Sequence, residues 1–246
     1  MINKRKLLIV GHPRCGSGYM SQLFQRCNLQ IGHERDWEDG MSCWFFAVFS
    51  EYSPWGIPKQ PGLSRFDFEF EYVVHYVRNP INAIPSILMQ IDETYARSIE
   101  KKASIYIYKN IDKSLGINIE KIYVNNLEKA IASYLFWNQI IENSQPSATF
   151  KVENCESEVL AFLRDKKLTD IDKIDRSKFF DTRLKNYNNS RQKFKVSAKP
   201  VITNSDWENV NESLKKELNE FCDRYSYLRI YSDYFKVIDS TKIIIL

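Results

Sequence analysis

Long apolar segments are missing from this sequence, and cysteine and histidine are scarce. No stretch approaches the ~18 consecutive apolar residues that a membrane-crossing helix needs, so no membrane span is expected. The five cysteines are an odd number, lie far apart and show no Cys-x-x-Cys spacing, which argues against a disulfide framework and a zinc site. The three histidines are also dispersed, and we expect no metal ion at the functional site.

The chain also has no large excess of positive or negative side chains. The chain carries 35 Lys and Arg against 31 Asp and Glu, a formal net charge of +4 at pH 7. This mildly basic balance suits a polyanionic ligand bound locally and does not require nucleic acid. The first apolar run begins within a few residues of Met1, which leaves no room for a cleavable signal peptide, and we expect a cytoplasmic protein. Nothing in the pattern indicates the oligomeric state.

Short apolar runs alternate with helical patterns along the chain. This alternation is typical of a three-layer α/β architecture with a central parallel sheet flanked by helices. A chain of 246 residues suits one domain over residues 1–246. The predicted elements are strands at 6–11, 29–33, 72–77 and 149–152, helices at 17–28, from about 80, at 119–143 and at 155–166, and a final helix of about twenty residues capped by Ser205.

Residues 7–24 combine an apolar run, a glycine-bearing turn and the start of an amphipathic helix. Gly11, Gly16 and Gly18 permit close backbone approach in the turn, and Pro13 stiffens it. Converging backbone N–H groups and the positive end of the helix make such a turn suited to phosphate. The pattern resembles a P-loop, Gly-x-x-x-x-Gly, and we therefore expect a fold like that of the P-loop nucleotide hydrolases.

The lysine of a P-loop is absent. Ser17 follows Gly16 at the position where a nucleotide triphosphatase carries the lysine that reaches the β- and γ-phosphates. Arg14 supplies a cation inside the turn instead. The turn is therefore poorly equipped for a triphosphate but suited to a 5′-phosphate.

A second motif lies in residues 72–86. An apolar run ends at Arg78, and Pro80 suits the first turn of a helix. Ser86 lies eight residues beyond the arginine, about two helical turns along. The forked guanidinium donors and the hydroxyl together predict an anion clamp.

In combination, the two motifs resemble those of the sulfotransferases that use 3′-phosphoadenosine-5′-phosphosulfate (PAPS). In that family Pro-[Lys/Arg]-x-Gly-[Ser/Thr] holds the 5′-phosphosulfate, and residues 13–17 match it. The second family motif, Val-[Val/Tyr]-x-x-Arg-[Asp/Asn]-Pro with a later serine, holds the 3′-phosphate, and residues 74–80 with Ser86 match it except at His75. The resemblance implies transfer of sulfate from PAPS, release of 3′-phosphoadenosine-5′-phosphate (PAP) and no metal.

The resemblance also implies which residues bind the donor. The family often closes a basic C-terminal loop over the cofactor, and the basic, asparagine-rich stretch 185–199 is the candidate here. Arg14 is in addition a candidate catalytic residue, because it lies where charge develops on the departing phosphate. The candidate cofactor-binding residues are Arg14, Cys15, Gly16, Ser17, Gly18, Tyr19, Arg78, Ser86, Asn189 and Arg191.

Transfer to a hydroxyl requires a base within hydrogen-bond reach of the acceptor oxygen. His33 and Glu34 end the second predicted strand, and ligands of open α/β sheets bind at the carboxyl ends of strands. Some bacterial sulfotransferases use a glutamate just after this strand, so Glu34 is the favoured base. His33 is the alternative, because imidazole has a suitable pKa and some relatives use histidine. Since side chains alternate along a strand, only one of the two is expected to face the cofactor.

The acceptor site is expected in the aromatic segment 34–70, between the two motifs. Trp37, Asp39 and Trp44 are the candidate acceptor contacts, and the Pro- and Gly-rich stretch 51–66 is expected to form a loop over them. The sequence therefore predicts a sulfotransferase that acts on a hydroxyl of a carbohydrate, lipid or small metabolite, with a small molecule or glycan as partner.

Two other functions stay open. One is a P-loop nucleotide kinase or triphosphatase, against which stand the missing lysine and the lack of an apolar run ending in a magnesium-binding aspartate. The other is a non-catalytic nucleotide-binding protein of the same fold. Its signature would be the loss of both candidate bases, and both are present.

Overall fold

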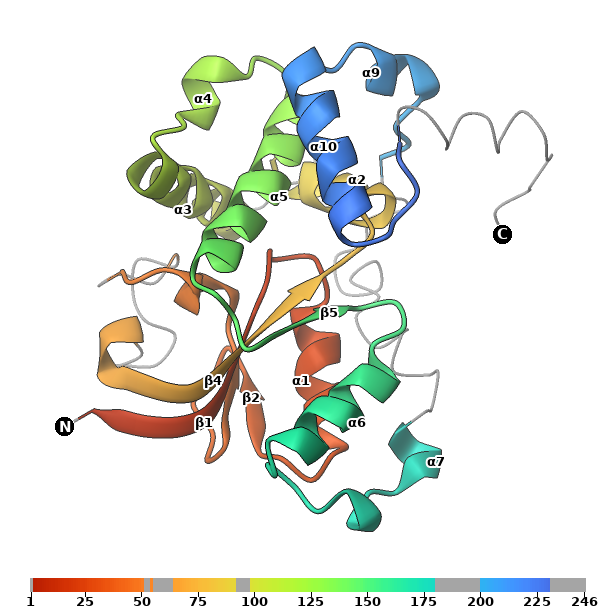
Figure 1. Cartoon of the computed structure of the whole chain (residues 1–246). Coiled ribbons are helices and arrows are strands. Elements are labelled where there is room, and N and C mark those ends of the chain that lie inside the picture. The colour runs from red at the N-terminus through yellow and green to blue at the C-terminus, as the bar shows by residue number, and fades with distance from the viewer. Residues whose placement is uncertain (1, 51–53, 55–63, 92–97, 180–199, 231–246) are drawn as a thin grey trace. The chain divides into compact units, whose positions relative to one another are not determined.

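The structure, a computed structural model, describes residues 2–50, 54, 64–91, 98–179 and 200–230 (Figure 1). The chain forms two compact units, Met1–Arg78 with Trp137–Ser197 and Asn79–Phe136 with Ala198–Leu246. Each unit is thus built from two separate stretches of chain. The single domain expected over residues 1–246 stays a prediction.

The first unit is built on a parallel β-sheet. Its described strands follow the order β2-β3-β1-β4-β5, and every neighbouring pair is parallel. This confirms the predicted α/β class with a central parallel sheet flanked by helices. The strands are β1 (Asn3–Val10), β2 (Ile31–His33), β3 (Gly40–Ser42), β4 (Phe68–Val77) and β5 (Ala148–Lys151).

The two longest strands, β1 and β4, pair side by side at the centre of this sheet. The second half of β1, Leu7 to Val10, is fully buried, and so is the end of β4 from Val74 to Val77. Continuous apolar runs of this kind are expected for parallel strands covered on both faces. The buried ends of both strands point to the same edge of the sheet, so whatever follows them in the chain meets there.

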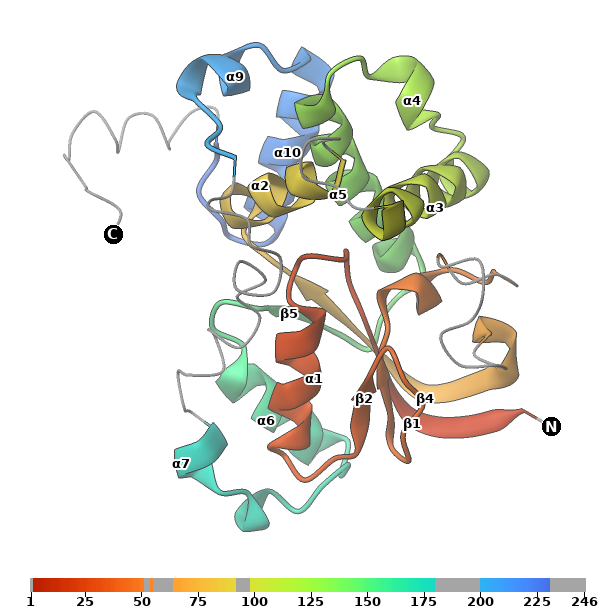
Figure 2. The same cartoon turned by 180° about the vertical axis from the view of Figure 1, so that it is seen from behind.

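Helices cover both faces of the sheet in the first unit. Figures 1 and 2 show α1 (Ser17–Gln25) and α6 (Glu156–Asp165) on one face. On the opposite face, Asn138 at the end of α5 (Asn126–Asn143) is hydrogen-bonded to His75 of β4, Oδ1 to Nε2, at 2.9 Å. The remaining short helices of this unit are η1 (Trp44–Ala47), η2 (Arg65–Asp67), η3 (Ile171–Lys173) and α7 (Arg176–Phe179).

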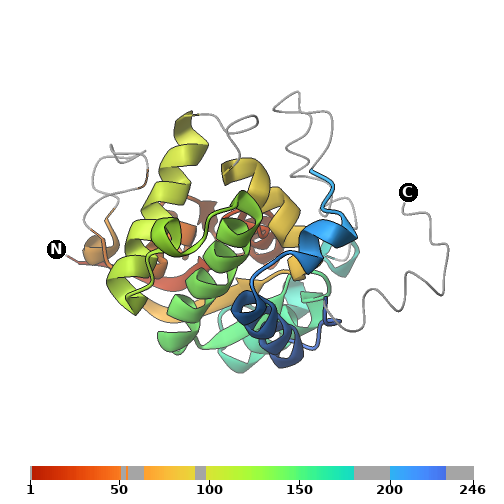
Figure 3. The same ribbon diagram turned by 90° about the horizontal axis from the view of Figure 1, so that it is seen from above.

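The second unit is helical in its described residues. Figures 1 and 3 show α10 beside α5, and the rings of Phe221 and Tyr134 join them with centroids 5.0 Å apart. Leu214 and Leu218 of α10 are buried as well, as the predicted apolar stripe requires. Besides the first part of α5, the helices are α2 (Pro80–Ile91), α3 (Ser98–Leu115), α4 (Ile119–Ile122), α9 (Asn204–Glu208) and α10 (Glu212–Arg224).

The single helix predicted over 119–143 is wrong, because the structure has two. Asn118 caps α4 by accepting a hydrogen bond from the backbone N–H of Lys121 at 3.1 Å. Asn125 caps α5 in the same way, accepting from Glu128 N at 2.8 Å. A second asparagine cap thus restarts the helix, and the apolar periodicity alone did not reveal the break.

The predicted final helix is also divided into two. Thr203, not Ser205, caps α9, and it forms a capping box with Asp206. Asn211 caps α10 by accepting from Ser213 N at 2.9 Å. Two caps eight residues apart therefore replace the one that the apolar pattern indicated.

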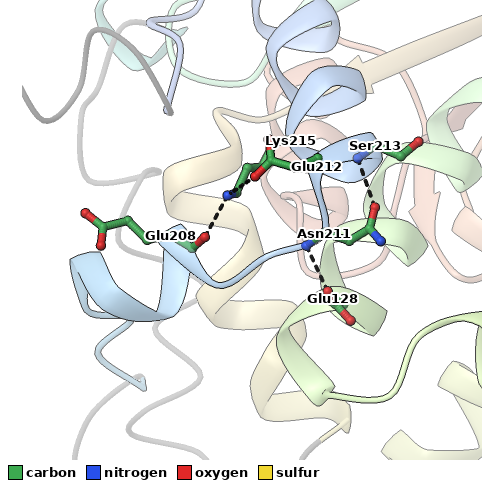
Figure 4. A network of polar contacts seen from close by, with 6 residues as sticks. All are labelled: Glu128, Glu208, Asn211, Glu212, Ser213 and Lys215. Atoms are coloured by element: carbon green, nitrogen blue, oxygen red, sulfur yellow. Dashed lines mark hydrogen bonds and ion pairs between the residues drawn. The ribbon is translucent and has the colours of Figure 1, made fainter.

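A polar network ties this cap region together (Figure 4). The ammonium group of Lys215 donates to the carbonyl oxygen of Glu208 at 2.6 Å and to Glu212 Oε1 at 2.5 Å. The backbone N–H of Asn211 donates to Glu128 Oε1 of α5 at 2.9 Å. These contacts join the end of α9 and the start of α10 to α5.

Some predictions lie outside the described residues. The basic stretch 185–199 is one of them, and most of the predicted loop 51–66 is another. Among the described helices, none is both long and apolar enough to cross a membrane.

Candidate functional site

The candidate site is the loop of residues 11–16, which leads from β1 into α1. The backbone N–H of Cys15 donates to His12 O at 3.2 Å and closes the turn. Arg14 and Gly16 both have positive φ, 72° and 113°. Glycine adopts this region without cost, whereas a non-glycine residue there is uncommon and strained. The loop therefore holds Arg14 in an unfavourable backbone conformation.

The amino terminus of α1 opens onto this loop. Gly16 is the N-cap residue, and it provides no side-chain hydrogen bond to the first turn. No acidic residue lies in that turn. The partial positive charge of the helix end is therefore not offset by its own side chains, which is the arrangement that favours an anion.

The sheet topology places the loop where α/β sheets bind ligands. β1 lies between β3 and β4, and its connection leads to β2, on the side of β3. The connection of β4 leads to β5, on the opposite side. Adjacent strands whose connections leave in opposite directions form a topological switch point, and ligands bind there at the carboxyl ends.

Residues at the ends of neighbouring strands brace the loop. Ser42, the last residue of β3, donates from its hydroxyl to the carbonyl oxygen of Ser17 at 3.0 Å. Val152, just after β5, lies against Gly16, so that a β-carbon at Gly16 would be 3.1 Å from its Cγ1. The tight fit and the positive φ both select glycine at this position.

Arg78 follows β4 and reaches the same loop. Its Nη1 donates to the carbonyl oxygen of Arg14 at 3.2 Å. The side chain is half-buried. The two arginines predicted to bind phosphates, one from each motif, thus meet at the carboxyl edge of the sheet.

His33, at the end of β2, also contacts the loop. Its Nε2 is hydrogen-bonded to Ser17 Oγ at 3.0 Å, although the residue as a whole is exposed. The imidazole of this candidate base is therefore held beside the first residue of α1. A hydroxyl and an imidazole in contact can pass a proton between them.

Glu34 is positioned by a buried tryptophan. Trp44, 2% exposed, donates from Nε1 to Glu34 Oε1 at 3.1 Å. Trp44 itself packs against Trp137 with ring centroids 6.0 Å apart. The predicted acceptor contact Trp44 is thus a core residue in this structure, and its indole N–H orients the candidate base.

The alternation of side chains along a strand does not decide which of the two candidate bases, His33 or Glu34, faces the loop. β2 ends at His33, and Glu34 has a positive φ of 52°. A residue in the left-handed region leaves the pleat of the strand, so the two-residue period no longer applies. His33 contacts Ser17, and the charge of Glu34 acts on Tyr76, which borders the same loop. That only one of the two faces a bound cofactor stays a prediction.

His12 is a structural member of the loop. It is fully buried, and its Nδ1 donates to the carbonyl oxygen of Pro13 at 2.5 Å. Burial lowers the pKa of His12 from 6.5 to about 4, against the opposing effect of this hydrogen bond. The imidazole is therefore neutral near pH 7 and holds the backbone of the turn.

The other loop candidates are largely buried. Cys15 is 1% exposed and Gly18 is buried. Tyr19 donates from its hydroxyl to Glu156 Oε1 at 2.9 Å, which ties α1 to the start of α6. Burial also raises the pKa of this phenol. The hydroxyl of Tyr19 therefore has a structural role in this fold.

Two predicted acceptor contacts lie in the connection from β2 back to the amino end of β3. The carboxylate of Asp39 is bound by Lys6 Nζ at 2.7 Å and by the backbone N–H of Gln30 at 2.7 Å. Trp37 is 40% exposed, and its carbonyl oxygen accepts from Gly40 N at 3.1 Å. The structure does not bring these side chains to the loop; Asp39 instead organises the start of β3.

Three further residues were predicted to bind the donor. Ser86 is buried on α2, in the second unit. Asn189 and Arg191 fall outside the described residues. Their roles stay predictions. Among the described residues there is no group of three or more His, Cys, Asp or Glu side chains that could hold a metal ion.

Two residues at the loop were missed from the sequence. Ser42 lies on a strand of only three residues within the aromatic segment 34–70, too short to be predicted from the sequence. Tyr76 is fully buried on β4, two residues before Arg78, and a two-residue period from the arginine would have found it. A β-carbon at Gly11 would lie 2.5 Å from Tyr76 Cε2, so the ring occupies the space beside the start of the loop.

In the first unit, the described residues thus combine a strained glycine-bearing loop, the open end of a helix, two arginines and two candidate bases at one edge of a parallel sheet. This set can bind an anion and accept a proton beside it. In comparisons with known proteins, the chain matches no family model, no curated protein and no solved structure.

Proposed function

We propose that this protein is a sulfotransferase that moves the sulfuryl group of PAPS to a hydroxyl of a carbohydrate, lipid or small metabolite. The hydrogen bond from Arg78 to the carbonyl of Arg14 carries the proposal, because it joins the two motifs on which the resemblance rests. Each motif alone is common in α/β proteins. Two motifs that meet at a topological switch point are a far more specific combination.

The chemistry of the loop suits the 5′-phosphosulfate better than a triphosphate. Ser17 stands where the triphosphatase lysine would be, and its side chain and carbonyl are engaged by His33 and Ser42. Arg14 provides the cation of the loop, together with the amides at the start of α1. Preorganised donors of this kind stabilise negative charge on a departing phosphate oxygen without a metal ion.

Arg78 suits the 3′-phosphate. A guanidinium presents five N–H donors in a fixed fork, and phosphate is bound best by such paired donors. The bond to Arg14 fixes the guanidinium at the carboxyl end of β4. Ser86 on α2 remains the predicted third donor.

Glu34 is the proposed base. In the reaction the acceptor oxygen bonds to sulfur, the bond from sulfur to the phosphate oxygen breaks, and the acceptor proton must leave. The carboxylate of Glu34 takes this proton, and the indole Nε1 of Trp44 orients it. His33 is the alternative, and its contact with Ser17 would let it act from the helix end.

Isothermal titration with two nucleotides tests the proposal. We expect the full chain to bind PAP in the absence of metal. Binding of ATP with magnesium and none of PAP would instead favour the kinase or triphosphatase. Binding of PAP without transfer of labelled sulfate to any member of a broad acceptor panel would favour a non-catalytic nucleotide-binding protein.

A further inference from the structure

Tyr76 is the buried polar residue at the loop that the proposed chemistry leaves unused. It lies one position past the last β1–β4 pair, Val10 with His75, and so stands beside Gly11. The ring is fully buried, and ring atoms and backbone of Tyr76 occupy the space that a side chain at Gly11 would need. Gly11 therefore makes room for this ring at the point where β1 becomes the loop.

The hydroxyl of Tyr76 lacks a hydrogen-bond partner among the described residues. Burial raises its pKa well above 10, and Cys15, Glu34 and Cys43 act in the same direction. Ser17 opposes this rise by acting as a hydrogen-bonding neighbour of the phenol, although the hydroxyl forms no hydrogen bond of good geometry. The phenol is thus a neutral donor at physiological pH, and it lies among residues of the loop and of its bracing strands.

An unsatisfied buried hydroxyl needs an explanation. It loses its bonds to water and gains none in the protein, whereas phenylalanine would fill the same space without that cost. Two polar groups that act on the phenol are bonded to other residues in this structure. Ser17 Oγ is paired with His33, and Glu34 Oε1 with Trp44.

We infer that Tyr76 is a positioning residue for the anion loop: when an anion occupies residues 13–17, Ser17 turns its hydroxyl hydrogen to the anion and its oxygen accepts the hydrogen of Tyr76. The phenol then acts through Ser17, since a hydroxyl that accepts a hydrogen bond becomes a better donor. The identity of the anion, a phosphosulfate or its phosphate product, rests on the proposed function. The hydrogen-bond relay itself does not.

Titration of the full chain with PAP and, separately, with inorganic pyrophosphate measures this role. We expect Tyr76→Phe to weaken the binding of both by about five- to tenfold, the cost of one net hydrogen bond. Without ligand, its melting temperature should equal or exceed that of the wild type, because no bond is lost. Tyr72→Phe is the matched control, on the same strand and face but four residues earlier, and should bind both anions as the wild type does. Wild-type affinity in Tyr76→Phe would overturn the inference.

Variants of Ser17 separate a relay from simple packing. In Ser17→Ala, adding Tyr76→Phe should cause no further loss of affinity, because the intermediate hydroxyl is gone. In Ser17→Thr, which keeps the hydroxyl, Tyr76→Phe should still weaken binding. Equal losses in all three backgrounds would show that Tyr76 does not act through residue 17.

Failure of this inference is distinguishable from failure of the proposed function. If wild type binds pyrophosphate but not PAP, the sulfotransferase proposal falls, and the pyrophosphate series still decides the role of Tyr76. If wild type and Tyr76→Phe bind PAP equally, the role of Tyr76 falls and the function stands. If wild type binds neither anion, both are wrong.

Discussion

Arg78 Nη1 donates a hydrogen bond to the carbonyl oxygen of Arg14 at 3.2 Å, across 64 positions of sequence. One end of the guanidinium fork thereby braces the loop that follows β1. Arg14 has a positive φ, so the contact fixes a carbonyl that belongs to a strained backbone. The arginine that is proposed to bind one phosphate thus also supports the turn that is proposed to bind the other.

Arg78→Ala should weaken the binding of PAP by about tenfold to one hundredfold. The ligand loses charge-assisted donors, and the carbonyl of Arg14 loses its partner. Isothermal titration measures the affinity. Arg5→Ala is the control, because Arg5 is paired with Asp36 at the amino end of the sheet and should leave affinity unchanged. If Arg78→Ala binds PAP as tightly as Arg5→Ala does, the assignment of the 3′-phosphate to Arg78 is wrong.

Glu34→Gln should leave PAP affinity unchanged and lower turnover by about one hundredfold or more, the usual effect of removing a general base. Glutamine keeps an oxygen for Trp44 Nε1, so the local structure is preserved. The measurement is the rate of sulfate transfer from labelled PAPS at saturating acceptor. His33→Gln, made in parallel, reports on the alternative base. A larger loss in His33→Gln than in Glu34→Gln would transfer the role to the imidazole.

Gly11→Ala should destabilise the protein by about 1–3 kcal/mol, the range for overpacking a core. The added β-carbon would meet the backbone oxygen of Tyr76 and its ring at 2.5 Å, and backbone cannot move aside cheaply. Urea unfolding measures the change. Gly116→Asn is the control, because its surroundings are open and asparagine tolerates a φ of 70°. A stability loss in Gly11→Ala no greater than in this control would contradict the tight packing at Tyr76.

Stability should fall between pH 6.5 and pH 4. Burial lowers the pKa of His12 and of His75 from 6.5 to about 4, so in this range the unfolded chain binds protons that the folded chain does not. Each histidine then lowers the free energy of unfolding by up to about 3 kcal/mol at pH 4. Above pH 6.5 both states carry neutral imidazoles, and these two residues add no pH dependence. Urea unfolding at half-unit pH steps measures the slope.

His75→Gln is the matched test of that slope. Glutamine can still donate to Asn138 Oδ1, as His75 Nε2 does at 2.9 Å, but it does not titrate. The variant should lose less stability on acidification than the wild type, whatever its stability at pH 7. An unchanged slope would mean that His75 is not held neutral in the fold.

The sequence by itself determined the helices and strands whose positions follow from the order of neighbouring residues. β1, the glycine-bearing turn and α1 lie where the apolar run, the glycines and the helical period predicted them, within a few residues at each end. β4 and the helix that starts at Pro80 do so too. Backbone preferences of glycine and proline and the burial of continuous apolar runs are properties of neighbouring residues, so they can be seen in the chain alone.

Only the tertiary structure decided which side chains meet. β3 has three residues, too few for any periodicity, and pairing with β1 and β2 defines it. Trp44 packs against Trp137 and donates to Glu34, whereas Asp39 is held by Lys6. These contacts depend on strand order and on residues distant in sequence. The motif residues were therefore identifiable beforehand, and the partners that position them were not.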